Sequence, residues 1–276
     1  MKYIRILFFL MSMTMLISCA EKLTSTGKKS DNDIAQNLRV LCYNIHHCNP
    51  PSVTGKIDLD AIAAVIKAQN PDLVALQEVD VNTIRSGKIN QASLLAEKLK
   101  MNFFFAKAID HEGGDYGVAI LSKYPLSENE IHRLSTQAGT KGEPRVLATA
   151  LVTLPGGKKI RFGSTHLDAQ KNDANRLLQV KELNEIAKRE KLPFIIAGDL
   201  NSMPGSAPIN LFDEQFIRTC ENCEFTIPVI NPSRAIDFVG FNKTDNFEVI
   251  SHQVIPERYA SDHLPILSVL RLKDSQ

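Results

Sequence analysis

Apolar residues follow two patterns that alternate along the chain, short continuous runs and a repeat with the helical period. Runs typical of buried strands are separated by segments whose apolar positions repeat with the helical period. In residues 58–71, Leu59, Ile62 and Ile66 fall on one helical face, and the pattern stops before Pro71. We expect further helices at residues 90–100 and 173–190, and strands at residues 38–44, 72–79, 103–109, 117–123, 193–200, 235–241, 247–255 and 265–272.

Residues 145–167 contain two β-rich runs on either side of Gly156-Gly157, the residue type that a tight hairpin turn requires. Helices alternate with strands early in the chain, whereas this hairpin lies in the middle, so we expect mixed sheets. Several strands are apolar on both faces and therefore need cover on both sides. Two sheets packed face to face with helices outside satisfy this pattern. With no repeat and no second linker, one domain over residues 38–276 is expected.

The N-terminus has the layout of a secretory signal. Two basic residues precede an apolar run from Ile6 to Ile17, which is too short to span a bilayer comfortably. The sequence LISC that follows resembles a bacterial lipobox, which predicts a signal peptide over residues 1–19 and lipidation of Cys19. The polar residues 20–37 are expected to form a flexible tether. We therefore expect an extracytoplasmic, membrane-anchored lipoprotein in the periplasm or at the cell surface; a plain signal peptide with an incidental cysteine is the alternative.

The net charge bears on nucleic-acid binding, and the cysteine content bears on disulfide or metal bonding. The formal net charge is +1 for the whole chain and −1 once residues 1–18 are removed, so no global basic field attracts nucleic acid. Of the cysteines other than Cys19, Cys220 and Cys223 are candidates for a small disulfide in an oxidising compartment. Buried free thiols and a zinc site are the alternatives.

Polar side chains lie at the ends of several apolar runs. Because strand side chains repeat every two residues, Asp199 and Asn201 are expected to point the same way if the extended conformation persists through Leu200. Taken singly, each polar residue has an ordinary explanation as a turn, cap or core residue. Together they form a desolvated cluster that is costly unless a cation or substrate compensates, so they predict a site. The residues are Asn44, Glu78, His166, Asp199, Asn201, Asp237, Asp262 and His263.

The motifs that carry these residues resemble those of the endonuclease/exonuclease/phosphatase superfamily, whose fold is that of pancreatic deoxyribonuclease. They occur in the order YNIHH, LQEVD, STHLD, GDLNSMP, IDFV and SDHLPI, and they span essentially the whole mature domain. GDLN together with SDHLP is highly specific. The resemblance implies an α/β fold, a four-layer α/β/β/α sandwich of two mixed sheets with outer helices, and magnesium-dependent cleavage of a phosphate ester.

The resemblance also implies a metal site. Glu78 is expected to be the principal Mg²⁺ ligand, with Asp262 and Asn44 close to the ion. Such an oxygen-rich set suits Mg²⁺, with Mn²⁺ as a substitute, better than it suits zinc. Some nucleases of the superfamily carry an aspartate where this chain has His46, so the metal is expected to see one carboxylate fewer, which bears on nuclease specificity more than on catalysis.

Five further residues match the superfamily's catalytic positions. Asp199 is expected to orient or deprotonate the attacking water, and Asn201 to hold the phosphate and that water in line. His263 would pair with Asp237, whose carboxylate fixes the tautomer and favours the cationic imidazole. His166 is expected to bond a phosphate oxygen or assist the leaving group, and the sequence leaves open which of the two histidines takes which role.

Asn44, beside its place near the metal, and four further residues are candidates for substrate contact. Arg145, in EPRV, resembles the superfamily arginine that supports the acidic cluster or a phosphate, and a structural salt bridge is the alternative. Arg85 and Arg176 are candidates to face the substrate, although surface solvation is the default for either arginine. Tyr116 follows a glycine-rich loop and is either a substrate contact or a rim aromatic.

The predicted protein is a monomeric, metal-dependent phosphoric ester hydrolase, most consistent with a phosphodiesterase or nuclease-like enzyme. Nucleic acids, phospholipids and small phosphoesters share this core chemistry, and superfamily membership does not choose among them. The near-neutral charge and the absence of Trp weigh against an efficient DNase. Two other classes remain open. One is a catalytically inactive surface module that binds phosphorylated ligands; the other is a zinc hydrolase using His46, His47 and Cys48, which lacks the usual helical spacing.

Overall fold

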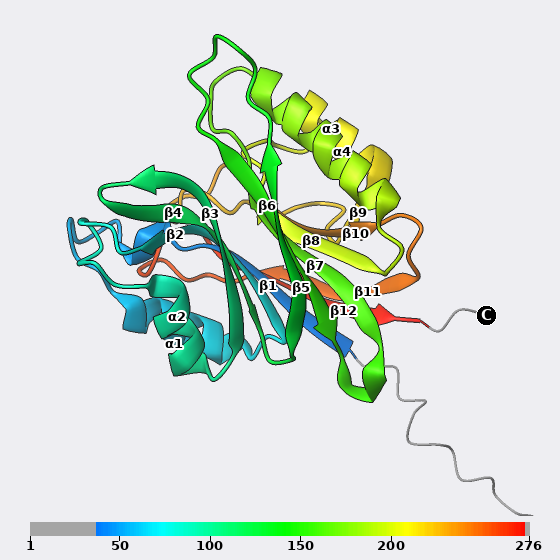
Figure 1. Cartoon of the computed structure of the whole chain (residues 1–276), viewed down its shortest axis with the longest axis horizontal. Helices are drawn as coiled ribbons and strands as arrows, with labels where there is room; N and C mark the ends of the chain where they lie inside the picture. The colour runs from blue at the N-terminus through cyan, green and yellow to red at the C-terminus, as the bar shows by residue number, and fades with distance from the viewer. Residues whose placement is uncertain (1–36, 274–276) are drawn as a thin grey trace, which may run out of the picture. The chain divides into compact units, whose positions relative to one another are not determined.

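The structure is a computed structural model that describes residues 37–273, and its core is two six-stranded sheets packed face to face (Figure 1). The predicted signal peptide, Cys19 and the tether up to residue 36 lie outside the described residues. Within residues 37–273, every helix is too short or too polar to cross a membrane.

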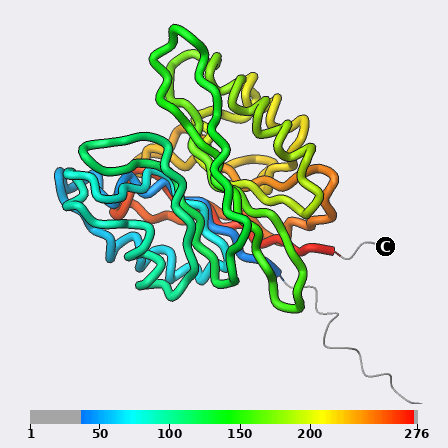
Figure 2. Tube along the Cα trace, viewed as in Figure 1, coloured from blue at the N-terminus to red at the C-terminus, as the bar shows by residue number. Residues whose placement is uncertain are grey.

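The first sheet has the strand order β11-β12-β1-β2-β4-β3. β1 and β2 run parallel and are connected through α1, whereas the other neighbours are antiparallel. Its strands are β1 (Asn37–Asn44), β2 (Leu73–Val81), β3 (Asn102–His111), β4 (Gly114–Ser122), β11 (Phe247–Val254) and β12 (Ile266–Leu272). Figure 2 shows the N-terminal strand β1 beside the C-terminal strand β12, which pair antiparallel.

The second sheet has the order β5-β6-β7-β8-β10-β9 and repeats the same plan. A central parallel pair, β7 and β8, is connected through α3, and the remaining pairs are antiparallel. Its strands are β5 (Leu126–Leu134), β6 (Arg145–Thr153), β7 (Lys159–His166), β8 (Phe194–Asp199), β9 (Phe216–Arg218) and β10 (Asp237–Asn242). Each sheet is therefore mixed, as the sequence predicts.

The helices form the two outer layers. α1 (Leu59–Gln69) and α2 (Gln91–Leu99) pack on the outer face of the first sheet, and α3 (Ala174–Arg189) and α4 (Ala207–Gln215) on that of the second. Asp58 caps the start of α1, where its side chain accepts a hydrogen bond from the Ala61 backbone nitrogen, and Asn70 caps the end in the left-handed conformation. Its predicted apolar face is buried against the sheet.

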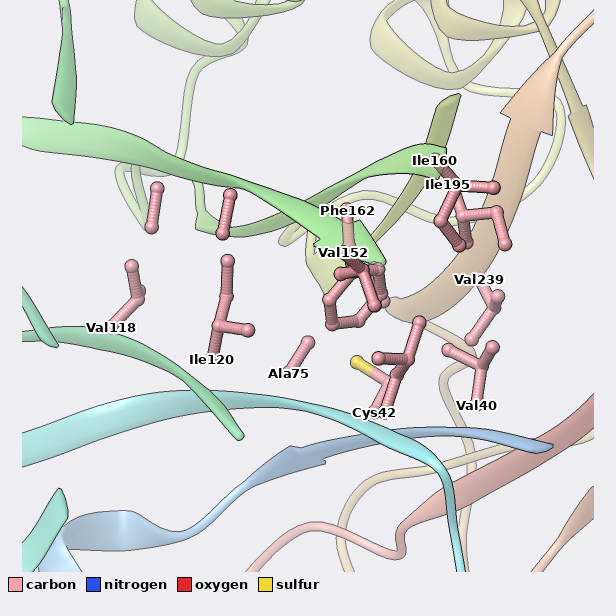
Figure 3. Close-up of a cluster of buried hydrophobic side chains, with 14 of the residues drawn as sticks. Val40, Cys42, Ala75, Val118, Ile120, Val152, Ile160, Phe162, Ile195 and Val239 are labelled. Carbon is pink, nitrogen blue, oxygen red and sulfur yellow. The ribbon is translucent and has the colours of Figure 1, made fainter. Parts of the chain in front are cut away.

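The inner faces of the two sheets form the central core (Figure 3). Val40, Cys42 and Ile120 of the first sheet face Phe162 and Ile195 of the second, and all five are buried. Since the outer faces are also covered by helices, the central strands are apolar on both sides. The four-layer arrangement implied by the sequence is confirmed.

Some elements differ from the predicted ones. β5 is a polar, largely exposed strand that pairs only with β6, so its sequence carries no apolar pattern. α4 was also not expected, and it begins with a proline in its first turn. The predicted turn at Gly156-Gly157 is present, with φ of 82° and 83° in a short 3-10 turn (Pro155–Gly157).

The cysteines take two of the forms considered above. Cys220 and Cys223 form a disulfide, while Cys42 and Cys48 are buried free thiols. The two free thiols lie on different elements, Cys42 in β1 and Cys48 in the 3-10 turn η2 (His46–Cys48). The described part of the chain therefore contains no four-cysteine zinc site.

Candidate active site

The ends of both parallel strand pairs bring polar side chains together. Asn44 ends β1 and Glu78 lies in β2, while His166 and Asp199 end β7 and β8 and are opposite each other in register. Asn44 Nδ2 donates to Glu78 Oε1 at 3.1 Å and to Asp199 Oδ2 at 3.2 Å. One buried amide therefore joins the two sheets and links the two carboxylates.

A β-bulge directs Glu78 into this cluster. The register of β2 against β4 shifts between Leu76 and Val79, and Glu78 has a φ of +57°. Gln77, one residue earlier, points to the second sheet and donates to Ser164 Oγ at 3.3 Å. A bulge adds one residue to the strand and changes the direction of the side chain there. A regular alternation of β2 does not predict this orientation.

Glu78 is held as an anion. Burial by itself raises the pKa of Glu78, but the His47 ring and the Asn44 amide more than offset it, so the pKa lies well below its ordinary value. His47 Nδ1 lies 3.9 Å from Glu78 Oε2. The carboxylate is therefore charged and ready to bind a cation at neutral pH.

Asp199 is 1% exposed and is surrounded by donors. Its Oδ1 accepts from the Asn201 backbone nitrogen at 2.9 Å. Its Oδ2 faces Nε2 of His166 at 3.5 Å and Nε2 of His263 at 3.8 Å. Burial and the negative charge of Asp237 raise the pKa of Asp199, so this carboxylate is more basic than an exposed one and suits proton transfer.

His263 forms the expected couple with Asp237. Its Nδ1 donates to Asp237 Oδ2 at 2.9 Å, and Thr226 Oγ1 donates to the same oxygen at 2.5 Å. Burial lowers the pKa of His263, but the adjacent Asp237 outweighs that effect and raises it to about 10. The imidazole is therefore cationic at neutral pH, with its Nε2–H directed toward Asp199.

His166 is the neutral histidine of the site. Arg145 Nη1 donates to His166 Nδ1 at 3.4 Å, and because a guanidinium only donates, the proton of the neutral ring is on Nε2, facing Asp199. Burial and the Arg145 charge lower the pKa of His166 well below its ordinary value. Arg145 also pairs with Glu143 at 2.9 Å. The two histidines thus differ in charge, although both approach one oxygen.

The residues around Glu78 fit a divalent cation. Glu78 offers an anionic oxygen, and one ring nitrogen each of His46 and His47 lies with it in a group whose ligand atoms are all within 4.8 Å of one another. Asn44 offers less than expected, because its oxygen accepts from the His46 backbone nitrogen while its Nδ2 faces Glu78. Asp262 is partly buried beside His263, and Ser261 Oγ lies 3.5 Å from its Oδ1.

The extended conformation does not persist through Leu200, so the condition for Asp199 and Asn201 to point the same way is not met. β8 ends at Asp199, and Asn201 has a φ of +49°. The cause is the hydrogen bond from the Asn201 backbone to the Asp199 carboxylate, which closes a local turn. The Asn201 side chain donates to the Leu167 carbonyl at 3.0 Å, so its own oxygen is left for other partners.

The other candidate substrate residues have partners within the fold. Arg85 pairs with the buried Asp80 and lies 5.5 Å above the Tyr116 ring. Tyr116 itself is buried, and it lines one small internal gap with Arg145 and His166. Arg176 is buried and donates to the carbonyls of residues 168 and 170. The structure thus brings Tyr116 and Arg145 to the site, while the hydrogen bonds of Arg176 are all within the segment before and at the start of α3.

Two residues support the site in ways that the sequence analysis did not predict. Thr226 lies in a loop without any motif, yet it supports Asp237. Ser261 stands directly before Asp262, and its hydroxyl donates to the Asn44 carbonyl at 2.7 Å. This bond holds the segment before β12 against the end of β1. Ser261 is the first residue of the SDHLPI motif, and this membership is the one signal for it in the sequence.

The model of the Endonuclease/Exonuclease/phosphatase family matches residues 41–274 of the sequence. This chain belongs to that family. The match covers β2, β7, β8, the second half of β1 and every site residue described above. The family relationship and the observed pair of mixed sheets agree with the resemblance drawn from the motifs.

Relatives of this family member cover most of its length. The uncharacterized protein YbhP of Escherichia coli K12 is 25% identical over 252 residues, which are 86% of this chain and 97% of YbhP. A solved endonuclease/exonuclease/phosphatase from Beutenbergia cavernae is 25% identical with a TM-score of 0.71, covering 86% of this chain and 72% of that one. A mannosyl-6-phosphatase from Bacteroides thetaiotaomicron shares the fold at 17% identity and a TM-score of 0.68, covering 84% and 99%.

Proposed function

We propose that this protein is a Mg²⁺-dependent phosphoric ester hydrolase that cleaves its substrate by in-line attack of an activated water. The observation that carries the proposal is the buried Asp199, which faces a neutral His166 and a cationic His263 while the Asn44 amide ties it to Glu78. Members of its family are nucleases and phosphatases, which all act on phosphate esters. The arrangement combines a base, a proton donor and an anionic cation ligand.

Each residue has a role that follows from its surroundings. Asp199 accepts the proton of the attacking water, because its pKa is raised. His263, held as a cation by Asp237, donates to a phosphoryl oxygen. His166 bonds the phosphate or the leaving group through its Nε2–H, and Arg145 holds its tautomer.

The metal completes the site at Glu78. A divalent cation bound there supplies Lewis-acid polarisation of the phosphoryl oxygen and compensates its developing charge. The substrate class within phosphate esters includes diesters, as the superfamily motifs imply, and monoesters, on which a fold relative from Bacteroides thetaiotaomicron acts. The proposed location is extracytoplasmic and lipid-anchored, which the N-terminal motif and the Cys220–Cys223 disulfide support.

The test is hydrolysis by the purified protein across plasmid DNA, RNA, a generic phosphodiester, sphingomyelin, inositol phosphates and phosphomonoesters. Each substrate is assayed with Mg²⁺, Mn²⁺ or EDTA. Asp199→Ala and His263→Ala are expected to lower kcat by about 10²–10⁴-fold. The exposed Asp110→Asn serves as the matched control and retains full activity.

Metal-dependent turnover that both active-site variants lose supports the proposal. Turnover that survives in both variants excludes these residues as the catalytic groups. Absence of turnover on every substrate, with phosphorylated ligands still bound, favours a binding module instead.

A further inference from the structure

We infer that His46 and His47 are metal ligands beside Glu78, so that the cation site of this protein contains nitrogen donors and prefers Mn²⁺ or another transition metal to Mg²⁺. The inference rests on the proposed function in placing a divalent cation at Glu78, and it replaces Mg²⁺ as the preferred ion there. It replaces the oxygen-only ligand set expected from the motifs with one specific to this chain.

The first observation is the geometry of the three donors. One ring nitrogen of each histidine and a Glu78 oxygen all lie within 4.8 Å of one another. His47 Nδ1 and Glu78 Oε2 are 3.9 Å apart. Two ligands of one ion, each about 2.1 Å from it, are at most about 4.2 Å apart. Small side-chain rotations are therefore enough to close the group around a cation.

The second observation is the state of the two rings. His46 Nδ1 lies 2.8 Å from the Asn49 carbonyl, and because a carbonyl only accepts, Nδ1 carries the proton and Nε2 presents its lone pair. Metal-bound histidines commonly donate their second nitrogen to a carbonyl in this way. His47 Nδ1 is buried and has no hydrogen-bond partner in the structure. One ring is oriented for a ligand role, and the other has a nitrogen that makes no hydrogen bond and lies 3.9 Å from Glu78 Oε2.

The third observation is the backbone that presents the rings. His46, His47 and Cys48 have φ of 45°, 44° and 59°, three successive non-glycine residues in the left-handed region. This conformation is unfavourable for L-residues, and such strain gathers at functional sites. Gln91 holds the turn in place by donating from Nε2 to the His47 carbonyl at 2.7 Å. The fold thus maintains an unfavourable turn whose result is to place both rings beside Glu78.

The donor set decides the metal. Mg²⁺ prefers oxygen ligands and retains several waters, whereas imidazole nitrogen suits later divalent metals. Two imidazoles and one carboxylate therefore favour Mn²⁺, Co²⁺ or Zn²⁺ over Mg²⁺. The buried Cys48, although adjacent in sequence, is not part of the group, so the site differs from the zinc hydrolase considered from the sequence.

The test measures metal binding directly. The EDTA-stripped full chain is titrated with Mn²⁺ by equilibrium dialysis, with Mg²⁺ as competitor. Pulsed electron paramagnetic resonance of the Mn²⁺-loaded protein then reports coupling to imidazole nitrogen. The variants are His46→Ala and His47→Ala, with His132→Ala, a histidine of β5 that bonds Thr149, as the matched control. His46→Asp provides a variant that restores an oxygen donor.

We expect nitrogen coupling in the wild type and in the His132 control. Either alanine variant should weaken Mn²⁺ binding about tenfold or more, and His46→Asp should retain binding while shifting preference toward Mg²⁺. Circular dichroism shows whether each variant is folded. If a folded His47→Ala variant binds Mn²⁺ like the wild type, or the wild type lacks nitrogen coupling, the inference is wrong.

The outcomes separate this inference from the proposed function. Metal-dependent hydrolysis without nitrogen coupling overturns the ligand assignment and leaves the hydrolase proposal intact. Nitrogen coupling without cleavage of any phosphate ester supports the ligand assignment and overturns the hydrolase proposal.

Discussion

Replacing Asp80 by Asn should strongly destabilise the protein. The Asp80 side chain is 0% exposed and accepts four hydrogen bonds, from Thr83, Ser86 and two nitrogens of Arg85. Asparagine removes the charge and places an N–H where an oxygen accepts. Breaking one partner of a buried ion pair costs about 3–5 kcal/mol. That loss is a large share of the roughly 5–15 kcal/mol by which a typical domain is stable.

The effect of this substitution should depend on pH. Burial raises the pKa of Asp80, but the bonds from Arg85, Ser86 and Thr83 outweigh it and the pKa is lowered. A lowered folded pKa contributes stability that is complete above the unfolded value of about 4 and is lost as pH falls through the folded value. The difference between wild type and Asp80→Asn should be constant from about pH 5 to 8 and should shrink below about pH 4.

Urea unfolding followed by far-ultraviolet circular dichroism measures this difference, since the chain has no Trp to report by fluorescence. Asp110→Asn is the matched control, because Asp110 also pairs with a basic residue, Lys107, but its side chain is 91% exposed. That control should leave the free energy of unfolding unchanged. A loss below about 1 kcal/mol for Asp80→Asn, or an effect that is equal at neutral and acidic pH, refutes the reasoning.

Three further outcomes follow from the packing and the site. Phe162→Ala should lower the free energy of unfolding by about 3–5 kcal/mol, because Phe162 is fully buried between the sheets. In the same urea experiment the control Ile131→Ala, at a site on β5 that is 42% exposed, should change the free energy of unfolding by less than about 0.5 kcal/mol. Reduction of the Cys220–Cys223 disulfide, which closes a loop of three positions, should cost about 2 kcal/mol, and unfolding curves with and without reductant that coincide would contradict this. Thr226→Val removes one donor to Asp237 and should lower kcat about tenfold with KM little changed; equal kcat in steady-state assays would show that Thr226 does not position the couple.

Much of the fold is predictable because its patterns are local. The apolar face of α1 and the strands around the central core are encoded by residue spacing, and the turn at Gly156-Gly157 by residue type. β5 is not predicted from the sequence, because an exposed edge strand buries one side at most and carries no apolar run. β5 is a strand because it pairs with β6, and this pairing depends on the folded structure and not on the local sequence of β5.

The sequence predicts which residues form the site better than it predicts the direction in which their side chains point. Strand-end polar residues indicated Asn44, Glu78, Asp199 and His263, and the structure brings all four together. Side-chain direction depends on features that spacing does not encode. The bulge at Glu78 and the turn after Asp199 are both examples, since each has a positive φ nearby that breaks the two-residue alternation.

The pairing of β1 with β12 bears on how the chain is made. Asn37 of β1 lies opposite Arg271 of β12, and Ser261, 217 positions after Asn44, bonds its carbonyl. During synthesis β1 can pair with β2 early, but it lacks its second neighbour until β12 has been made, about 220 positions later, and such long-range pairing forms slowly. Since His263 lies three positions before the start of β12, the candidate site and the closed sheet are completed in the same late step. Fragments cut short before that point therefore have neither.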